Sequence, residues 1–368
     1  MSRVVHLRSG QGLYGAERAL LVLARATEPP LEPVVVTLAR PGRADPLGEA
    51  ARDAGLPAVR VDATGRLSPA ALGPLVQLAR GGLLHAHDYK SLLLGLAAGA
   101  VTRIPVVATF HGDTGHLPRV RLYEALARRA ARWAAAVATP SEPLAARLRA
   151  ASPRTPVHVV PNGIPLGPLP TAEARARARA ALGFPECVPV VAFVGRLSVE
   201  KSPEVLLRAA AGLEHAVVLA GDGPLRAHLE VEARGRARFL GFVADVAPLL
   251  AAADVLALPS RTEGLPLAVL EAMAAGVPVV ASAVGALPEV LEGGAGLLVP
   301  PGDVAALRAA LVRLRDPGLR SALAAAGRAR VEARHGAAAM ARAYLERLYR
   351  PALERARGDA HAPQLQAR

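Results

Sequence analysis

Two glutamates flank a short apolar segment, and their spacing suits contact with an extended ligand. Glu263 and Glu271 are separated by seven residues, GLPLAVL, that carry no charge and no side-chain hydrogen-bonding group. Pro266 is tolerated in the first turn of a helix, and the run after it consists of good helix formers. If the helix begins near Leu265, a rise of ~1.5 Å per residue places the two carboxylates roughly 12 Å apart along its axis.

That separation excludes the paired-carboxylate chemistry of glycoside hydrolysis. The two carboxylates lie about 5 Å apart in retaining glycosidases and ~6.5 to 9.5 Å apart in inverting ones. The two glutamates can instead hold the two ends of one ligand. The alternative is that Glu271 is solvated on the polar face of the helix and that Glu263 is an acidic residue at the helix start.

Basic residues follow a buried, strand-like run at 188–196. Gly195, Arg196 and Lys201 come at or just after its end. A glycine that lets the backbone approach, a forked guanidinium and a mobile ammonium suit a pyrophosphate group. The chain has 44 Lys and Arg residues, and only Lys90 and Lys201 are lysines, which favours a specific role for Lys201 over a solvated basic loop.

Two further loops complete this candidate site. The GDG turn at 221–223, which includes Gly223, precedes a helix and by itself is typical of an ordinary turn. Ser260 and Glu263 precede another helix, whose N-terminal amides favour an anion. Pro266 has no N–H, so the donors must be the amides of Leu265, Leu267 or Ala268. A diphosphate flanked by a sugar and a ribose would fit between the two glutamates, and such a ligand is a nucleotide sugar.

Short valine-rich runs alternate with helical patterns throughout, which is typical of parallel sheets covered by helices. Seven strands are predicted in the first half, at 4–9, 33–39, 56–62, 83–88, 105–112, 135–141 and 156–163. Six more are predicted in the second half, at 188–196, 215–223, 237–243, 254–260, 277–282 and 296–300. We therefore expect an α/β fold of two doubly wound, Rossmann-like domains that bind ligands at the carboxyl ends of their strands, in a cleft between the domains.

The same pattern sets the expected domain boundaries. The first domain spans 1–168 and the second 169–335, with a Pro- and Gly-rich linker near 161–170. A helix at about 336–357 is expected to pack back on the first domain. The tail, 358–368, is expected to be disordered.

Charge and composition narrow the range of partners. The net charge is +13, but the basic residues are spread along the chain and aromatic residues make up 3 %, too few for a base-stacking surface, so no nucleic acid is expected. An anionic membrane surface or a phosphorylated substrate fits the charge better. The uncharged run 272–288 has 17 residues, is broken by glycine and proline, and falls short of a spanning helix. No signal peptide is visible and the single cysteine, Cys187, fits a reducing compartment, so we expect a cytoplasmic protein.

In the first domain, Gly15 precedes a helix whose N-terminus could face the donor phosphate. His111, in TFHG, ends a buried strand, where a lone histidine is as often structural as functional. His85 and His87, in HAHD, share one face of a strand with no third metal ligand evident, so no metal site is predicted. We assign His87, Asp88, Lys90 and His111 to the acceptor side of the cleft.

The segment 119–133, RVRLYEALARRAARW, combines five arginines with Leu122, Leu126 and Trp133. This pattern predicts an amphipathic helix. Its apolar stripe either packs on the core or contacts an anionic membrane.

Over residues 188–300 the sequence resembles the retaining GT-B glycosyltransferases of family 4, also described as glycosyl transferases group 1. Four motifs occur with the order and spacing of that family: GRLSVEK, GDGP, LGFV, and the pair of glutamates seven residues apart. The first half resembles the same family more loosely, through GAER, TFHG and PNGI.

The resemblance implies a role for each matching residue. Glu271 would hold the ribose hydroxyls, and Arg196 with Lys201 the diphosphate. Glu263 would hold hydroxyls of the donor sugar, His111 would lie beside that sugar, and the backbone of Phe242 and Val243 would line the base. The predicted catalytic residues are Glu263, His111, Arg196 and Lys201, and the predicted donor-binding residues are Gly15, Gly195, Arg196, Lys201, Gly223, Phe242, Val243, Ser260, Glu263, Gly264, Leu265, Leu267 and Glu271.

The predicted reaction is transfer of a sugar, with retention, from a nucleotide diphosphate sugar to a hydroxyl of a sugar or lipid-linked acceptor. A UDP-sugar is favoured over GDP-mannose, and the product would belong to polysaccharide, lipopolysaccharide or glycolipid synthesis. The chain has no D-x-D triplet to anchor manganese, so Arg196, Lys201 and helix amides must meet the leaving-group charge and no metal or other cofactor is expected. The resemblance implies front-face attack, in which the departing phosphate takes the acceptor proton.

Two other functions remain open at this point. One is a nucleotide-sugar epimerase of GT-B architecture, and the other is a non-catalytic sugar-nucleotide binding protein. Release of nucleotide that requires an acceptor separates a transferase from both.

Overall fold

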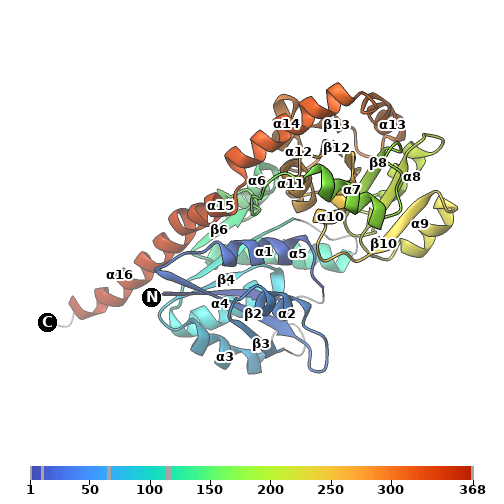
Figure 1. The fold of residues 1–368 in the computed structure, drawn as a ribbon. Coiled ribbons are helices and arrows are strands. Elements are labelled where there is room, and N and C mark those ends of the chain that lie inside the picture. The colour runs from blue at the N-terminus through green and yellow to red at the C-terminus, as the bar shows by residue number, and fades with distance from the viewer. Residues whose placement is uncertain (1, 10–11, 64–67, 113–117, 366–368) are drawn as a thin grey trace. The chain divides into compact units, whose positions relative to one another are not determined.

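The structure, a computed structural model, describes residues 2–9, 12–63, 68–112 and 118–365. The chain divides into two compact units: Met1–Gly163 together with Ala337–Arg368, and Ile164–Gly336. In Figure 1 the first unit runs from blue to green and returns in red, and the second runs from green to orange. Each unit is built on its own parallel sheet.

The first unit has a sheet with strand order β3-β2-β1-β4-β5-β6-β7, all parallel. Its strands are β1 (Ser2–Arg8), β2 (Leu31–Ala39), β3 (Ala58–Asp62), β4 (Leu83–Ala86), β5 (Val106–Thr109), β6 (Ala136–Thr139) and β7 (Val157–Val159). Its helices are α1 (Gly15–Arg25), α2 (Pro46–Asp53), α3 (Pro69–Ala79), α4 (Tyr89–Thr102), α5 (Pro118–Ala130), the 3₁₀ turn η1 (Ala131–Trp133), α6 (Glu142–Ala151), α15 (Ala337–Tyr344), the π-helical turn η3 (Leu345–Tyr349) and α16 (Arg350–Leu365).

Alternation along β1 distributes its side chains between two cores. Val5 and Leu7 face the layer formed by α3, α4 and α6. Val4 faces the opposite layer, where α1 and the C-terminal segment pack. There Leu348 and Tyr349 are almost fully buried, and each side chain of this size stabilises the fold by about 1.5–3 kcal/mol. The C-terminal segment therefore belongs to the core of the first unit.

The second unit has a sheet with strand order β10-β9-β8-β11-β12-β13, also parallel. Its strands are β8 (Val190–Val194), β9 (Ala216–Ala220), β10 (Ala237–Gly241), β11 (Val255–Leu258), β12 (Val279–Ser282) and β13 (Leu297–Val299). Its helices are α7 (Ala172–Ala181), α8 (Pro203–Ala210), α9 (Arg226–Ala233), α10 (Ala247–Ala252), α11 (Leu267–Ala274), α12 (Leu287–Val290), the 3₁₀ turn η2 (Glu292–Gly294), α13 (Val304–Arg313) and α14 (Pro317–Arg334).

The predicted α/β architecture with two doubly wound sheets is confirmed. Each predicted strand is present, and most end two to four residues earlier than predicted, because the predicted ranges included the first residues of the following loops, such as the GDG turn at 221–223. Helix α16 continues through 358–365, where the sequence predicted disorder; alanine and leucine in this stretch are compatible with a helix. Residues 366–368 of that tail lie outside the described residues. Within the described ranges, no helix combines the length and apolarity needed to cross a membrane.

Candidate functional site

The loops that follow β8 and β9 approach each other so closely that glycine is required. A Cβ at Gly221 would lie 1.9 Å from the carbonyl oxygen of Gly195, and the φ of Gly221 is +141°. A Cβ at Gly223 would lie 2.3 Å from the carbonyl oxygen of Leu197. The GDG turn is therefore fixed by backbone contact, and it supports the loop that carries Arg196 and Lys201.

Lys201 and Glu263 form an ion pair just beyond the neighbouring strands β8 and β11. The Nζ atom of Lys201 lies 2.6 Å from Oε1 and 2.7 Å from Oε2 of Glu263. Ser260 is fully buried and its hydroxyl donates to Oε1 at 2.7 Å. The Glu263 side chain is only 6 % exposed, so three residues that the sequence predicted as candidates form one fixed polar cluster.

Arg261 ties the two loops of this cluster together. Its Nε donates to the hydroxyl of Ser202 at 2.9 Å, and its backbone amide donates to the carbonyl oxygen of Glu200 at 2.8 Å. Ser202 is buried with a φ of +46°, a left-handed conformation that is uncommon outside glycine. The sequence did not reveal this contact, because one more arginine in an arginine-rich chain has no distinctive spacing.

The loop after β12 supports the other side of Glu263. A Cβ at Gly285, whose φ is +60°, would lie 2.3 Å from the carbonyl oxygen of Glu263. The amide of Ala286 donates to the carbonyl oxygen of Gly264 at 2.9 Å. Gly285 is therefore needed for close backbone approach, a role that the sequence reading missed because it concentrated on the two glutamates.

The helix that carries Glu271 begins later than predicted. Helix α11 starts at Leu267, and Pro266 is its N-cap, with a ψ of 127°, rather than a residue of its first turn. The fixed φ of proline suits both positions, so composition could not separate them. Residues 263–266 are not helical, and the estimated 12 Å between the two carboxylates therefore loses its basis. Leu265 and Leu267 have buried side chains.

The remaining donor candidates lie on or beyond the carboxyl edge of the same sheet. Arg196 is exposed one residue beyond Gly195, and Phe242, 53 % exposed, follows β10 with Val243. Glu271 lies in α11, the helix after β11, and is partly exposed. This edge therefore presents cations, carboxylates and an exposed aromatic ring.

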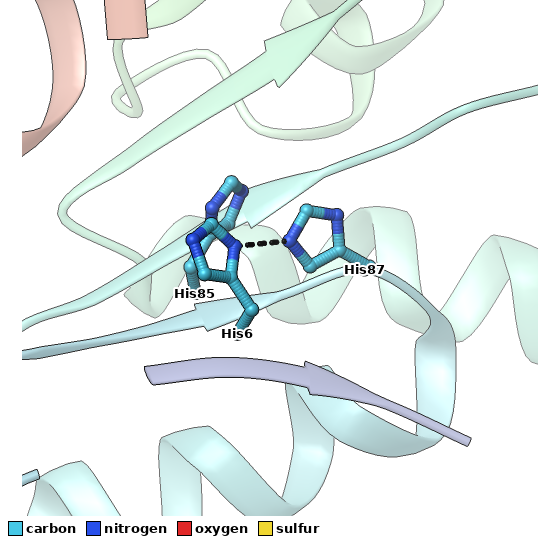
Figure 2. A group of neighbouring side chains, drawn as sticks. All are labelled: His6, His85 and His87. Carbon is cyan, nitrogen blue, oxygen red and sulfur yellow. Dashed lines mark hydrogen bonds between the residues drawn. The ribbon is translucent and has the colours of Figure 1, made fainter. Parts of the chain in front are cut away.

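In the first unit, imidazoles form a hydrogen-bonded chain at the carboxyl ends of β1, β4 and β5. The Nδ1 atom of His6 lies 3.0 Å from Nε2 of His87, and Nδ1 of His87 lies 3.0 Å from Nε2 of His111. Figure 2 shows the rings of His6, His85 and His87 gathered together, with the ring of His6 pointing to that of His87. His87 and His111, both predicted from the sequence, are thus in direct contact.

His85 is not part of this row of imidazoles and makes a separate set of hydrogen bonds. Its Nδ1 lies 2.9 Å from the hydroxyl of Tyr349, and its Nε2 lies 2.7 Å from the hydroxyl of Thr109. Tyr344 in turn lies 3.0 Å from Thr109. Two tyrosines of the C-terminal segment therefore fix His85 from the far end of the sequence.

Burial keeps these histidines neutral. It lowers the pKa of His6 to about 3, and burial together with the Arg8 guanidinium lowers the pKa of His111 to about 3. The pKa values of His85 and His87 are also lowered, first by burial and then by neighbouring imidazoles.

His6 supplies the third imidazole that the sequence analysis did not find. It lies opposite His85 because β1 pairs with β4, and strand pairing is not visible in the sequence. One nitrogen from each of His6, His85 and His87 lies within 4.8 Å of the others. The nitrogens of His85 and His87, and Nδ1 of His6, already bond to one another, to His111 or to hydroxyls, so the arrangement is a hydrogen-bonded imidazole cluster.

Asp88 and Arg8 organise the backbone around this chain. Asp88 caps α4 by accepting from the amides of Lys90 and Ser91, and it also accepts from Ser9 at 2.6 Å. Arg8 pairs with Glu17 at 2.8 Å and donates to the carbonyl oxygen of His87. The Asp88 carboxylate, predicted on the acceptor side, thus has a structural role as a helix cap.

The start of α1 leaves open space around Gly15. A Cβ at Gly15 would meet no atom within 4 Å. Glu17 accepts from the amide of Tyr14, the N-cap of α1, at 3.1 Å, so this amide already has a partner. Lys90 lies in the first turn of α4, and burial lowers its pKa.

Comparison with known proteins finds glycosyltransferases that match nearly the whole chain. Residues 188–316 match the family described as "Glycosyl transferases group 1", and residues 14–167 match "Glycosyltransferase Family 4". The solved structure of HepE from Anabaena in complex with UDP-glucose superposes with a TM-score of 0.84 at 24 % identity, covering 94 % of this chain and 99 % of that one. Sucrose-phosphate synthase from Thermosynechococcus elongatus has a TM-score of 0.74 at 23 % identity, covering 100 % of both chains. These structures show the fold.

Curated relatives are more similar in sequence. A D-inositol 3-phosphate glycosyltransferase of Actinosynnema mirum is 37 % identical over 287 residues, which is 67 % of this chain and 68 % of the relative. A GDP-mannose-dependent mannosyltransferase of Corynebacterium glutamicum, acting on a monoacylated phosphatidylinositol monomannoside, is 37 % identical over 44 % of this chain and 48 % of its own length. From these matches, the chain belongs to the family 4, group 1 glycosyltransferases of GT-B fold.

Proposed function

We propose that this glycosyltransferase moves a sugar, with retention and without a metal ion, from a nucleotide diphosphate sugar to an acceptor hydroxyl. The observation that carries the proposal is the cluster of Lys201, Glu263 and Ser260, held at the carboxyl edge of the second sheet. This cluster presents an ammonium group next to an oriented carboxylate. Such a pair can meet the negative diphosphate and the sugar hydroxyls at adjacent positions of one donor.

Each residue has a distinct task in this reaction. Arg196 and Lys201 neutralise the charge that develops on the departing diphosphate, which removes the need for a metal ion. Glu263 holds hydroxyls of the transferred sugar, and Glu271 holds the ribose. The acceptor attacks from the same face as the leaving group, and a departing phosphate oxygen takes its proton, so no side chain acts as a nucleophile.

The related proteins guide the choice of substrates. HepE was solved with UDP-glucose, and the mannosyltransferase relative is named as GDP-mannose-dependent. We favour a UDP-sugar as donor, with GDP-mannose as the alternative. The acceptor is a sugar or a lipid-linked sugar of cell-envelope polysaccharide, lipopolysaccharide or glycolipid synthesis, and the reaction takes place on the cytoplasmic side.

Helix α5 supports contact with an anionic membrane surface. Leu122 and Leu126 are 58 % and 47 % exposed, and Trp133, just after the helix, is 64 % exposed beneath the guanidinium of Arg132. Arg128 and Arg129 lie in the last turn. Binding to anionic vesicles should fall as salt rises and should weaken in the double variant Arg128→Glu, Arg129→Glu. Salt-independent binding, or none, contradicts this contact.

The test of the function is acceptor-dependent release of nucleotide. The full chain is incubated with UDP-glucose or GDP-mannose and with candidate sugar acceptors, and the anomeric configuration of the product is read by NMR. We expect release that requires the acceptor, resists EDTA and gives a product of the donor's configuration. Release without an acceptor would favour a hydrolase, and an inverted product or loss of activity in EDTA would overturn the retaining or metal-independent mechanism.

A further inference from the structure

The central imidazole of the chain, His87, uses both of its ring nitrogens in hydrogen bonds to other histidines. Nε2 faces Nδ1 of His6 and Nδ1 faces Nε2 of His111, each at 3.0 Å. A neutral imidazole has one N–H donor and one lone-pair acceptor. His87 must therefore donate to one neighbour and accept from the other, which couples the protonation of all three rings.

Only two neutral arrangements satisfy both hydrogen bonds. In the first, all three rings carry their proton on Nδ1, so that His6 donates to His87 and His87 donates to His111. In the second, all three carry it on Nε2 and the direction is reversed. The lowered pKa values of the three histidines exclude protonated rings at neutral pH.

The two arrangements differ at the ends of the chain. Nε2 of His6 and Nδ1 of His111 are both buried, and neither has a hydrogen-bond partner among the described residues. The first arrangement leaves a lone pair in the core at His6 and an N–H at His111. The second leaves an unpaired N–H at His6, whose side chain is fully buried. Each arrangement therefore leaves one N–H and one acceptor without a partner. His111 is partly exposed, whereas His6 is fully buried. An unpaired N–H costs more free energy deep in the core than near the surface, so the first arrangement is favoured.

We propose that His6 is a positioning residue that, through His87, holds His111 in the Nδ1–H tautomer, so that His111 is a hydrogen-bond donor and not a base. That His111 lies beside the transferred sugar rests on the proposed function. This assignment agrees with a mechanism in which the leaving phosphate takes the acceptor proton. It also gives a role to His6, which no sequence motif singled out.

The surrounding backbone holds the chain in register. His6 lies opposite His85 in the pairing of β1 with β4, and the carbonyl oxygen of His87 accepts from Arg8. The amide of His87 donates to the carbonyl oxygen of Leu7 at 3.0 Å. The His6 and His87 rings therefore have little freedom to exchange partners.

The direct test is the ring-nitrogen NMR spectrum of the full chain labelled with ¹⁵N-histidine, recorded without substrate at pH 7.5. Signals are assigned by their loss in His6→Leu, His87→Gln and His111→Gln. We expect all three rings to show the Nδ1–H tautomer in at least about tenfold excess. Nε2–H at His111, mixed tautomers, or different tautomers among the three rings would overturn the proposal. Because no substrate is present, this result is independent of the proposed function.

A matched pair of variants then tests the part played by His6. In His6→Leu, His87 loses the imidazole that bonds to its Nε2. The excess of the Nδ1–H tautomer at His111 should then fall several-fold. Tyr349→Phe removes a hydroxyl bonded to His85 in the same core and should leave His111 unchanged. An unchanged His111 tautomer in folded His6→Leu contradicts the positioning role. If His6→Leu does not fold, the spectrum of the unmodified protein still decides the tautomer.

Discussion

At the scale of single residues, the best-defined chemistry is a carboxylate held by an ammonium and a hydroxyl. Lys201 contacts both oxygens of Glu263, and Ser260 bonds to one of them. These bonds fix the direction of the carboxylate. Sequence spacing predicted all three residues as candidates, but it assigned Lys201 and Glu263 to different parts of the ligand and did not predict their contact.

Lys201→Arg should keep the fold and lose activity. A guanidinium is planar and longer than an ammonium, so it cannot occupy the same position against both oxygens of Glu263 while reaching a diphosphate. We expect an unchanged Tm without ligand and a loss of at least tenfold in kcat/KM, about 1.4 kcal/mol of transition-state stabilisation.

Arg208→Lys is the matched control for this exchange. It changes the same pair of residue types in an exposed ion pair with Glu232, at 2.7 Å. Its kcat/KM should stay within about twofold of that of the unmodified protein, because surface ion pairs contribute little to stability. Full activity of Lys201→Arg would reduce Lys201 to one more positive charge in a basic loop.

Glu263→Gln and Glu271→Gln should affect different steps. Loss of a ribose contact at Glu271 weakens nucleotide binding, because that contact exists before and during the reaction. The proposed contact of Glu263 with the donor sugar lies nearer the forming oxocarbenium. Its loss should therefore lower kcat with little change in the Kd for UDP. Calorimetric titration of UDP into both variants, with kcat measured in parallel, separates the two. Equal losses of UDP affinity contradict the assigned roles.

At the scale of elements, loops rather than helices place the cluster. Gly221, Gly223 and Gly285 allow close backbone contacts, and Arg261 links the loop after β11 to the loop before α8. Valine-rich runs predicted the strands that end at these loops. The contacts between loops were not predictable, because they depend on which strands are neighbours and on φ values that the sequence does not encode by spacing.

Arg261→Ala should lower activity more than stability. Its side chain is largely exposed, so the Tm should change by no more than a few degrees. Lys201 and Glu263 would be held less accurately, and we expect kcat/KM to fall about five- to tenfold. Arg315→Ala, a substitution at an arginine outside these loops, is the control and should leave kcat/KM unchanged. A large loss of Tm with normal kcat/KM would show that Arg261 only stabilises the fold.

At the scale of the whole molecule, the C-terminal segment completes the core of the first unit and fixes buried histidines within it. Tyr344 and Tyr349 reach Thr109 and His85, more than 200 residues away in sequence. The alternating pattern of strands and helices was enough to predict two doubly wound sheets. His6 was missed because a single histidine in a strand has no spacing signal, and its neighbours come from β4 and β5.

Stability should fall in mild acid. The folded-state pKa of His6 and of His111 is about 3, against 6.5 for an exposed histidine. As the pH falls below 6.5 the unfolded chain binds protons first, so this stabilisation is complete above pH 6.5 and is lost between 6.5 and 3. Each of the two histidines contributes a slope of about 1.4 kcal/mol per pH unit in that range.

Urea unfolding between pH 7.5 and 5 measures this slope. His6→Leu should unfold with a smaller pH dependence, reduced by about one histidine's share. His228→Gln, at an exposed position, should retain the full dependence. A free energy of unfolding that does not change from pH 7.5 to 5 would contradict the buried neutral cluster.

The central claim, that the second unit holds a nucleotide diphosphate sugar, is tested most directly by thermal shift with UDP, GDP, ADP and CMP. A ligand at about 100 times its Kd stabilises by ~2.7 kcal/mol, which corresponds to a rise of a few degrees in Tm. We expect a rise with one nucleoside diphosphate, UDP before GDP, and a reduced rise in Glu271→Gln. No rise with any of the four nucleotides at millimolar concentration, or an equal rise in Glu271→Gln, would contradict the account.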